Sequence, residues 1–356
     1  MSKQASDAFN SSTRVLVTGG SGFLGGHIVR QLLDDAAITV AIVSRHPKLP
    51  ADITHHSRIS IHAADVSVPA QINAVFEAVK PHAIIHTASP TYLDTTTALV
   101  KANIDGTRAL LQASKECSDT RAFVFTSSHT AVVPTQKPLS EDDAELYTET
   151  NSPNAYAMSK AVAERIVIAA NSSELRTSAI RMPSIWGQND PNFVPQLVAS
   201  IRKKEHKMQV GSNTKLFEFL YIDKAAEAHI LAMRSLLDPE SSGAAGEAFF
   251  ISDGKPYPFF DFSRKFYAAG GHPVAPEEVT TIPLGAMQVM ASTVEWAYWV
   301  FTLGYMKPTL RRVSIDQLDT GCCWSLEKAK KTLGYEPVAD QDDAIKETMA
   351  WAMANL

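Results

Sequence analysis

A glycine-rich turn between an apolar segment and a helical pattern constrains the fold of this chain most strongly. Residues 14–18, RVLVT, are typical of a buried strand, and glycines follow at positions 19, 22 and 25. Gly19 can adopt the positive φ of a tight turn, and Gly25 allows the following helix to pack close to the strand. The segment therefore predicts the first strand, turn and helix of a βαβ unit.

Short apolar runs alternate with amphipathic stretches through the first half of the chain. The expected strands, rich in β-branched residues, cover 14–18, 38–44, 58–64, 83–88, 122–128 and 176–182. Helical patterns separate them, for example at 70–80 and 98–116. Near-continuous apolar strands alternating with helices predict an α/β fold, with a Rossmann-type, doubly wound parallel sheet covered by helices on both faces.

The pattern becomes irregular near residue 190, where prolines, glycines and aromatic residues accumulate. We expect a flexible tail over 1–13, a Rossmann domain over 14–190 and a smaller, mostly substrate-binding region over 191–356. Residues 247–253 still resemble a sheet strand. The C-terminal region should therefore return one strand to the sheet and interleave with the Rossmann domain.

Composition excludes several functional classes. The formal net charge is -5 and no basic run is present, which argues against nucleic-acid binding. The three cysteines, Cys117, Cys322 and Cys323, show no zinc-binding spacing, so we expect no metal site and a reducing compartment. Residues 1–13 are polar and lack the apolar core of a secretory signal. These features favour a cytoplasmic protein.

The glycine turn predicts a dinucleotide site. Gly22 has no side chain to hold a pyrophosphate away from the backbone, and the helix that starts at Phe23 and Leu24 offers free N–H groups and the positive end of its dipole. Three glycines alone are a weak signal, but their place between the first strand and first helix is the context that a dinucleotide site requires.

The end of the second strand indicates which dinucleotide binds. It carries Ser44 and Arg45, with no carboxylate for a ribose 2′-hydroxyl, and a guanidinium can pair with a 2′-phosphate. NADP(H) is therefore favoured, and NAD(H) remains open because Arg45 is also compatible with a solvated loop. Asp65 and Val66, after the third strand, suit either an adenine contact or a plain turn.

A second group of residues predicts proton transfer. Tyr156 and Lys160 lie four residues apart at the start of a helical pattern, so they share one helix face. A nearby ammonium group stabilises a phenolate, which lets tyrosine exchange a proton. The strand before this helix ends in hydroxyl residues, of which we expect Ser128 first and Ser127 second to hold the substrate oxygen. His129 suits either the pocket wall or ordinary packing.

These motifs together carry a family resemblance. TGGSGFLG, HTAS, NIDGT, TSS and YAMSK resemble, in this order, the extended short-chain dehydrogenase/reductase superfamily. IRMPSIWG, FLYIDKAAEAHILA and GEAFFISDGKPYPFFDF resemble its 3β-hydroxysteroid dehydrogenase family, and VEWAYWVFTLGYMKP the sterol-4α-carboxylate 3-dehydrogenase branch. The similarity covers roughly residues 14–350.

The resemblance implies an oxidoreductase in which Tyr156 transfers the proton, Lys160 assists it and Ser128 positions the oxygen. It also implies cofactor contacts from residues beyond the turn: His86, Thr87, Ala88, Asn103, Pro183 and Ser184. The chain departs from the family at Ser44-Arg45, where steroid-oxidising members usually carry aspartate and use NAD. Here it resembles the dihydroflavonol reductase branch, which uses NADP, and this leaves the physiological direction open.

The C-terminal half favours a hydrophobic substrate. Trp186 and Phe193 belong to a set of aromatic residues that suits a bulky apolar ring, although each is also compatible with ordinary core. Residues 284–306 contain a single charged residue, Glu295. We expect this segment to pack over the substrate pocket, with contact to a membrane surface such as the endoplasmic reticulum second and a true span last. Resemblance also suggests a homodimer.

The sequence thus predicts an NADP(H)-preferring oxidoreductase that interconverts a secondary alcohol and a ketone on a steroid, terpenoid, meroterpenoid or polyketide ring, in specialised metabolism. Three alternatives stay open. They are an NAD-dependent, decarboxylating sterol-4α-carboxylate 3-dehydrogenase, a sugar-nucleotide epimerase and a cofactor-sensing regulator without catalysis.

Overall fold

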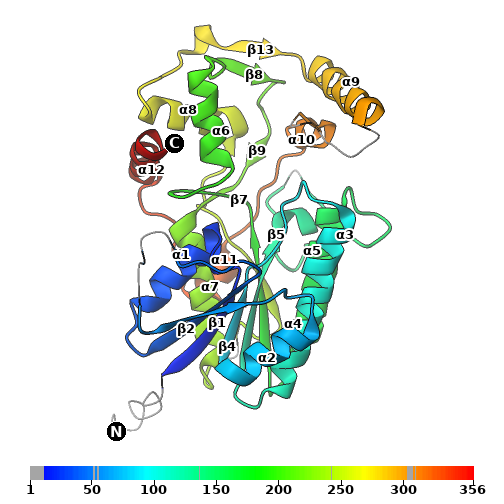
Figure 1. Cartoon of the computed structure of the whole chain (residues 1–356). Helices are drawn as coiled ribbons and strands as arrows, with labels where there is room; N and C mark the ends of the chain where they lie inside the picture. The colour runs from blue at the N-terminus through cyan, green and yellow to red at the C-terminus, as the bar shows by residue number, and fades with distance from the viewer. Residues whose placement is uncertain are drawn as a thin grey trace.

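A parallel sheet of seven strands forms the centre of the molecule (Figure 1). The computed structural model describes residues 12–50, 53, 56–135, 137–241, 243–302, 308 and 310–356, so most of the expected tail over 1–13 lies outside the described residues. The strand order is β11-β6-β5-β4-β1-β2-β3. The strands are β1 Thr13–Thr18, β2 Ile38–Ser44, β3 Ile59–Ala63, β4 Ala83–His86, β5 Ala122–Ser128, β6 Arg176–Met182 and β11 Glu247–Phe250. The predicted Rossmann-type α/β fold is confirmed.

Alternating side chains of each strand enter two separate cores, because successive residues of a strand point to opposite faces. In β1, Val15 and Val17 pack into one core, whereas Leu16 packs into the other. Helices α1 Phe23–Leu33, α7 Ile222–Leu237 and α11 Glu327–Leu333 cover the first face. Helices α2 Pro69–Val79, α4 Gly106–Glu116 and α5 Ala155–Ala169 cover the second.

The helix expected over 98–116 is not uniform. It consists of α3 Thr96–Leu99, a π-helical turn η2 Val100–Asp105, and then α4. The π-helical turn holds Asn103, whose buried side chain donates a hydrogen bond to Ser159 Oγ of α5 at 2.9 Å. Such turns are frequent at functional sites, and this one fixes α4 against the helix that carries Tyr156.

A smaller region lies beyond the carboxyl ends of the sheet strands (Figure 1). Its elements are β7 Ser184–Trp186, α6 Phe193–Arg202, β8 Met208–Val210, β9 Leu216–Phe217, β10 Phe219–Tyr221, β12 Tyr257–Pro258, α8 Phe259–Ala269, β13 Thr280–Ile282, α9 Leu284–Thr302, α10 Arg312–Gln317 and α12 Gln341–Asn355. Aromatic residues of α6, α8 and β10 form a third core there. Helix α7 and strand β11 follow several of these elements in sequence. Because α7 covers the seven-stranded sheet and β11 is one of its strands, the two regions interleave.

Helix α9 leaves most of its apolar side chains exposed, so its expected packing over the substrate pocket stays a prediction. Ala291 is its one buried residue among those described, and its main neighbour is α10. Trp296 and Trp299 are each 65% exposed and Phe301 is 85% exposed. Among the residues described, no helix combines the length and apolar character that a membrane span needs. Residues 303–306 lie outside the described residues.

Candidate active site

Helix α5 places Tyr156 and Lys160 at the carboxyl end of β5. The Asn154 side chain caps the helix by accepting a hydrogen bond from Ala157 N, so Tyr156 lies in the first turn. Lys160 follows one turn later, and its Nζ donates to the Thr126 carbonyl at 2.9 Å. The Lys160 Nζ is 5.9 Å from the centre of the Tyr156 ring. The predicted helix face therefore brings both side chains to the end of the same strand.

Successive residues at the end of β5 contact different elements. Ser128 lies next to Tyr156, whose pKa it lowers. Thr126 Oγ1 lies 2.9 Å from His229 Nε2 of α7. His129 is anchored by its Nδ1, which lies 3.1 Å from the Met182 carbonyl. The strand end is thus tied to both faces of the sheet, with Ser128 at the tyrosine.

Ser127 does not lie beside Tyr156, which corrects its place in the expected substrate pocket. Its hydroxyl donates to Glu164 Oε2, and the residue is buried. The alternation of side chains along β5 is the physical reason, since neighbouring residues of a strand cannot both face one site.

Burial opposes charge on both catalytic candidates. It raises the pKa of Tyr156, an effect that the neighbouring Ser128 hydroxyl partly offsets. Burial also lowers the pKa of Lys160 to about 7. A nearby ammonium group stabilises a phenolate. Tyr156 therefore ionises most easily when positive charge, from Lys160 or from an oxidised nicotinamide, is next to it.

The glycine turn forms a cradle that a side chain would fill. Gly19 has φ +73°, and a Cβ there would lie 2.9 Å from Thr87 Oγ1 and 3.0 Å from the Ala88 backbone. A Cβ on Gly25 would lie 2.2 Å from the Gly19 carbonyl oxygen. Gly22 is the N-cap of α1, and no side chain caps the helix. These residues, with the backbone of Phe23 and Leu24, fit a pyrophosphate.

The end of β2 fits an adenosine ribose or its 2′-phosphate. The Ser44 hydroxyl is buried without a partner among the described residues, and Arg45 is exposed. Asp65 accepts hydrogen bonds from Ser67, which is the main cause of its lowered pKa, and Lys101 Nζ lies 3.7 Å from its Oδ2. Asp65 and the basic residues Lys101 and Arg45 therefore lie near one another at this end of the sheet.

Two expected cofactor residues have structural roles. The His86 side chain is buried between Thr18 and Thr107 hydroxyl groups, at 2.7 and 3.1 Å, and burial lowers its pKa to about 3. Its imidazole is therefore neutral and fully engaged, which leaves only its backbone for a cofactor. Val66 is also buried and packs closely against Gly106 of α4. A Cβ on Gly106 would lie 2.8 Å from Val66 Cγ2.

The other expected cofactor residues lie nearer open positions. The Asn103 Oδ1 is buried without a partner among the described residues. Pro183 is buried and Ser184 is exposed, at the start of β7. Both follow β6, whose last residue pairs with Ser128. Their assignment to the nicotinamide remains a prediction.

Trp186 and Phe193 belong to the third core, which corrects their expected place in the substrate pocket. Trp186 is fully buried, and its Nε1 donates to Asp253 Oδ2 at 3.0 Å. Phe193 stacks on Phe262 with ring centres 6.0 Å apart. Core and pocket aromatics have the same composition and spacing, so sequence alone could not separate them.

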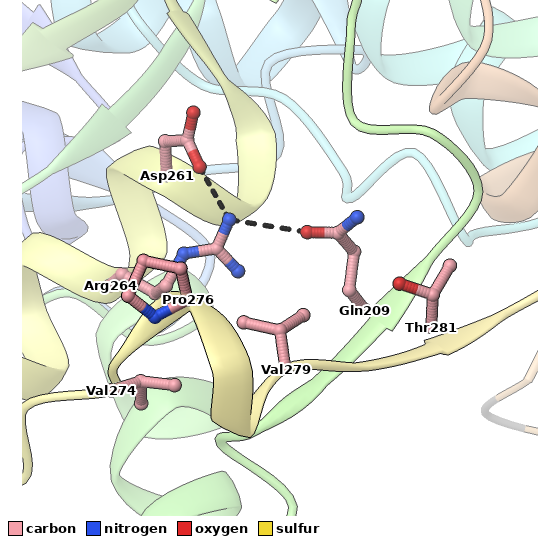
Figure 2. Close-up of a pocket in the computed structure, with 7 residues that line it drawn as sticks. All are labelled: Gln209, Asp261, Arg264, Val274, Pro276, Val279 and Thr281. Carbon is pink, nitrogen blue, oxygen red and sulfur yellow. Dashed lines mark hydrogen bonds and ion pairs between the residues drawn. The ribbon is translucent and has the colours of Figure 1, made fainter.

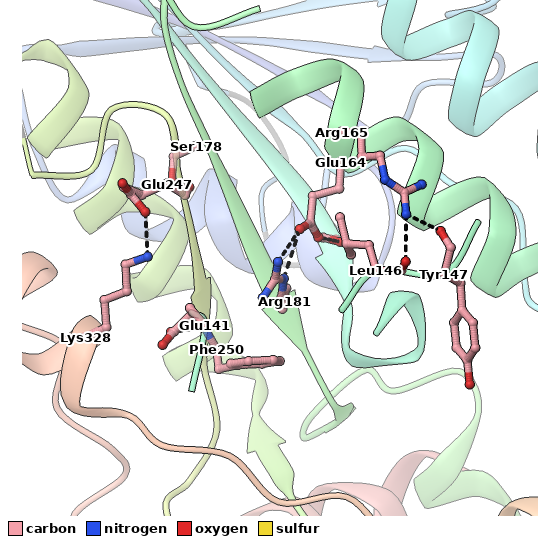
Figure 3. Close-up of polar contacts among 11 residues, drawn as sticks. Glu141, Leu146, Tyr147, Glu164, Arg165, Ser178, Arg181, Glu247, Phe250 and Lys328 are labelled. Carbon is pink, nitrogen blue, oxygen red and sulfur yellow. Dashed lines mark hydrogen bonds and ion pairs between the residues drawn. The ribbon is translucent and has the colours of Figure 1, made fainter. Parts of the chain in front are cut away.

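Sequence reasoning missed a buried ion pair behind the site. Glu164 of α5 accepts two hydrogen bonds from Arg181 of β6, at 2.9 and 2.7 Å, beside its contact with Ser127 (Figure 3). Glu164 lies four residues after Lys160, on the helix face already identified, and this spacing was the available signal. The pair ties α5 to both β5 and β6, one residue before Ser128 and two before Pro183.

Two pockets lie away from the catalytic residues. One, of about 370 Å³, lies in the smaller region, where the Arg264 guanidinium donates to both Gln209 and Asp261 (Figure 2). The other, of about 380 Å³, is lined by Glu164, Arg181 and charged residues of neighbouring elements. Neither contains Ser128, Tyr156 or Lys160.

Comparison with known proteins places the chain among steroid-transforming relatives. The profile of the 3-beta hydroxysteroid dehydrogenase/isomerase family matches residues 16–284. The sterol-4-alpha-carboxylate 3-dehydrogenase, decarboxylating, of Gibberella zeae is 64% identical over 287 residues, which cover 80% of this chain and 95% of that protein. The protein of the same name from Schizosaccharomyces pombe is 32% identical over 93% of this chain and 95% of its own length.

Solved structures agree with the fold. The UDP-glucose 4-epimerase of Thermotoga maritima superposes with a TM-score of 0.72 at 18% identity, covering 96% of this chain and 99% of that one. The dTDP-glucose 4,6-dehydratase of Bacillus anthracis, in complex with NAD, gives 0.72 at 16% identity, covering 96% and 97%. At these identities the likeness shows the fold alone.

Proposed function

Since this chain belongs to the 3-beta hydroxysteroid dehydrogenase/isomerase family, in its sterol-4-alpha-carboxylate 3-dehydrogenase branch, we propose that it oxidises the 3-hydroxyl group of a sterol 4-carboxylate. The 64% identity with the Gibberella zeae enzyme, over 95% of that protein, is the observation that carries this proposal. It replaces the specialised-metabolite step that the sequence favoured with the sterol alternative.

The catalytic residues supply the proton chemistry. A nicotinamide dinucleotide, which the glycine turn and the end of β2 would hold, would supply the hydride acceptor for the substrate carbon. Ser128 holds the substrate oxygen by a hydrogen bond, and Tyr156 removes the hydroxyl proton as general base. Protonated Lys160 favours the phenolate form of Tyr156. The alcohol loses one proton and one hydride, so a ketone forms.

Loss of carbon dioxide follows from the position of the ketone. A 3-ketone makes the 4-carboxylate a β-keto acid, in which the C–C bond to the carboxylate breaks and its electron pair enters the ketone as an enolate. A proton then adds at C4. The protein needs no metal or further group for this step beyond donors at the ketone oxygen, a role that Ser128 and protonated Tyr156 suit.

A direct assay tests the proposed function. Purified protein is given a sterol 4α-carboxylate and either NAD⁺ or NADP⁺, and the reduced dinucleotide and released carbon dioxide are measured. Equal amounts of both products are expected. Turnover of UDP-sugars without net change of the dinucleotide would instead favour an epimerase, and binding without turnover of either substrate class would favour a regulator.

Arg45 is expected to select the phosphorylated cofactor. We expect NADPH to bind more tightly than NADH, because a guanidinium pairs with the 2′-phosphate and Ser44 offers no carboxylate to a 2′-hydroxyl. Arg45→Asp should reverse this preference, with a loss of about 10- to 100-fold in NADPH affinity. Titration of dinucleotide fluorescence measures both constants. The control is Arg108→Asp, because Arg108 belongs to an exposed ion pair. Arg58 is unsuitable as a control, since its guanidinium donates to three backbone carbonyls.

Tighter NADH binding by the unaltered protein would contradict this assignment. That result would favour NAD(H) as cofactor and oxidation as the physiological direction. Both are compatible with the proposed sterol oxidation. A homodimer through α4 and α5 stays a prediction.

We propose that α9 rests on a membrane surface, such as the endoplasmic reticulum, where a sterol substrate dissolves. Its exposed tryptophans suit a lipid interface, and its one acid, Glu295, accepts a hydrogen bond from Arg312 N. Replacing Trp296, Trp299 and Phe301 with serine should weaken binding to phospholipid vesicles at least about 100-fold. Flotation of the protein with vesicles measures this binding.

The matched control replaces exposed apolar residues elsewhere, Ile61 and Tyr92, with serine. This control should float like the unaltered protein. The proposal would be contradicted if the α9 variant floated with vesicles as well as the unaltered protein does. It would also be contradicted if the unaltered protein did not bind vesicles and self-associated through α9 instead.

A further inference from the structure

His27, a buried residue of α1, contacts two hydrogen-bond acceptors at once. Its Nδ1 lies 2.6 Å from Asp223 Oδ1, and its Nε2 lies 3.1 Å from the Gln188 carbonyl oxygen. Burial raises the pKa of Asp223, but its polar neighbours outweigh this effect, so the pKa is lowered and the side chain is an ionised acceptor. A peptide carbonyl also only accepts. Both contacts are therefore hydrogen bonds only when both ring nitrogens carry protons, and the ring is then a positive imidazolium.

The two partners of His27 follow the ends of two paired strands. Strands β7 and β10 run parallel, and Trp186 pairs with Tyr221 where they end. Gln188 follows Trp186 by two residues, and Asp223 follows Tyr221 by two residues, in the first turn of α7. The His27 ring therefore bridges the ends of β7 and β10 and ties both of them to α1.

Neighbouring contacts hold the same segments in place. Gln31, one turn after His27, donates from its side chain to the Asp223 carbonyl oxygen at 2.9 Å. Asp190, two residues after Gln188, is buried, and its carboxylate accepts hydrogen bonds from backbone N–H groups at the start of α6. His27 thus links the helix of the glycine turn directly to the loop that enters the smaller region.

The charge of His27 also affects the expected pyrophosphate site. His27 follows Phe23, the first residue of α1, by four residues, which is about 6 Å along a helix axis. The two rings meet edge to face, with centres 5.8 Å apart. An imidazolium compensates the Asp223 carboxylate. A neutral ring leaves this carboxylate without its partner near a negatively charged pyrophosphate, and it also loses one of the two hydrogen bonds.

We propose that His27 is a positively charged positioning residue that holds α1 against the ends of β7 and β10, and that dinucleotide affinity falls when His27 loses this charge. The proposal rests on the proposed function only in that a dinucleotide binds at the first turn of α1. Affinity is therefore highest at acidic pH and decreases as the pH rises through the range in which His27 is deprotonated.

Other titratable groups lie on the elements packed around this contact: Arg30 of α1, Tyr221 of β10, Lys224 of α7 and Asp190 of the loop before α6. Arg30 and Tyr221 lower the pKa of Asp223, against the larger effect of its burial. Lys224 is paired with Glu227 at 2.7 Å. Lys160, at the catalytic end of the site, also titrates near neutral pH, because burial lowers its pKa to about 7. Proteins that differ only at His27 share all of these groups.

Calorimetric titration with NAD⁺ over a series of pH values tests the proposal, because the phosphates of NAD⁺ keep the same charge throughout the series. At acidic pH, NAD⁺ should bind the unaltered protein about 10-fold more tightly than His27→Gln, as expected for one partly screened charge. At alkaline pH the two proteins should bind it equally. The ratio of their dissociation constants cancels the titration of Lys160. His272→Gln, at an exposed histidine of the smaller region, is the matched control and should bind NAD⁺ like the unaltered protein at every pH.

Removal of the Asp223 charge separates an electrostatic effect from a packing effect. The double variant His27→Gln/Asp223→Asn has no carboxylate to compensate, so it should recover most of the affinity that His27→Gln loses at acidic pH. Asp223→Asn alone should show a weaker pH dependence than the unaltered protein, and it replaces His27→Gln if that variant does not fold. The histidine ring signals in NMR spectra, assigned by comparison with His27→Gln, give the pH range in which His27 loses its proton. The change in affinity should fall in the same range.

A ratio of dissociation constants that does not change with pH would overturn the proposal, as would a double variant that binds no better than His27→Gln. Ring signals of a neutral His27 throughout the pH series would also overturn it. Normal NAD⁺ binding without oxidation of any sterol would refute the proposed function alone. Absence of dinucleotide binding by the unaltered protein would refute the dinucleotide site and the effect on affinity together, while the ring signals would still decide the charge of His27.

Discussion

Replacing Tyr156 with phenylalanine is expected to lower kcat for sterol oxidation about 1,000-fold, because general acid–base groups typically contribute between about 100- and 10,000-fold. The variant keeps the ring in the first turn of α5 and loses only the hydroxyl next to Ser128. Dinucleotide should still bind, since the glycine turn and α1 are unchanged. Steady-state kinetics and fluorescence titration measure the two effects separately.

Tyr147→Phe is the matched control. Tyr147 is a partly buried tyrosine whose backbone N–H bonds to Ala131, and its hydroxyl lies in no catalytic contact described above. Activity of this variant should stay close to that of the unaltered protein. Full turnover by Tyr156→Phe, with dinucleotide bound normally, would refute the proposed proton transfer.

Replacing Arg181 with methionine is expected to lower the free energy of unfolding by about 3–5 kcal/mol, since removal of one partner leaves a buried charge without compensation. Glu164 is 1% exposed and accepts both its guanidinium hydrogen bonds from Arg181. Methionine can still pack on Phe250, whose ring centre lies 5.0 Å from the guanidinium carbon. Urea unfolding followed by tryptophan fluorescence measures the change.

An exposed ion pair provides the comparison. Lys330→Met breaks a pair with Glu327 in which both side chains are largely exposed, and such pairs contribute about 0–1 kcal/mol. Replacing both Glu164 and Arg181 with apolar residues should recover part of the lost stability. The buried pair would have no structural importance if Arg181→Met and Lys330→Met cost the same.

The parts of the fold with a strict periodicity were predictable from sequence. Strands β2, β5 and β6 begin and end where their apolar runs do. The glycine turn, Tyr156, Lys160 and Ser128 lie at the strand ends and helix starts that their local spacing predicted. Their roles in binding and catalysis stay predictions. The resemblance to the 3β-hydroxysteroid dehydrogenase family is confirmed over residues 16–284.

Features that depend on distant contacts were not predictable. Arg181 pairs with Glu164, a partner that the chain brings to it only on folding, and arginine is not unusual at that position in the sequence. Trp186 resembled a pocket residue because burial in the third core produces the same aromatic pattern as a binding site. The apolar composition of α9 does not specify what covers it.

The return of β11 and α11 to the sheet has a consequence for how the chain is made. A ribosome must pass residue 250 before β6 gains its outer neighbour, and residue 333 before α11 covers that edge. Five elements of the smaller region are therefore synthesised before the sheet is complete: β7, α6, β8, β9 and β10. The two regions cannot be exchanged between relatives by a single crossover near residue 190, because such a chimera would combine an edge strand and a sheet of different origin.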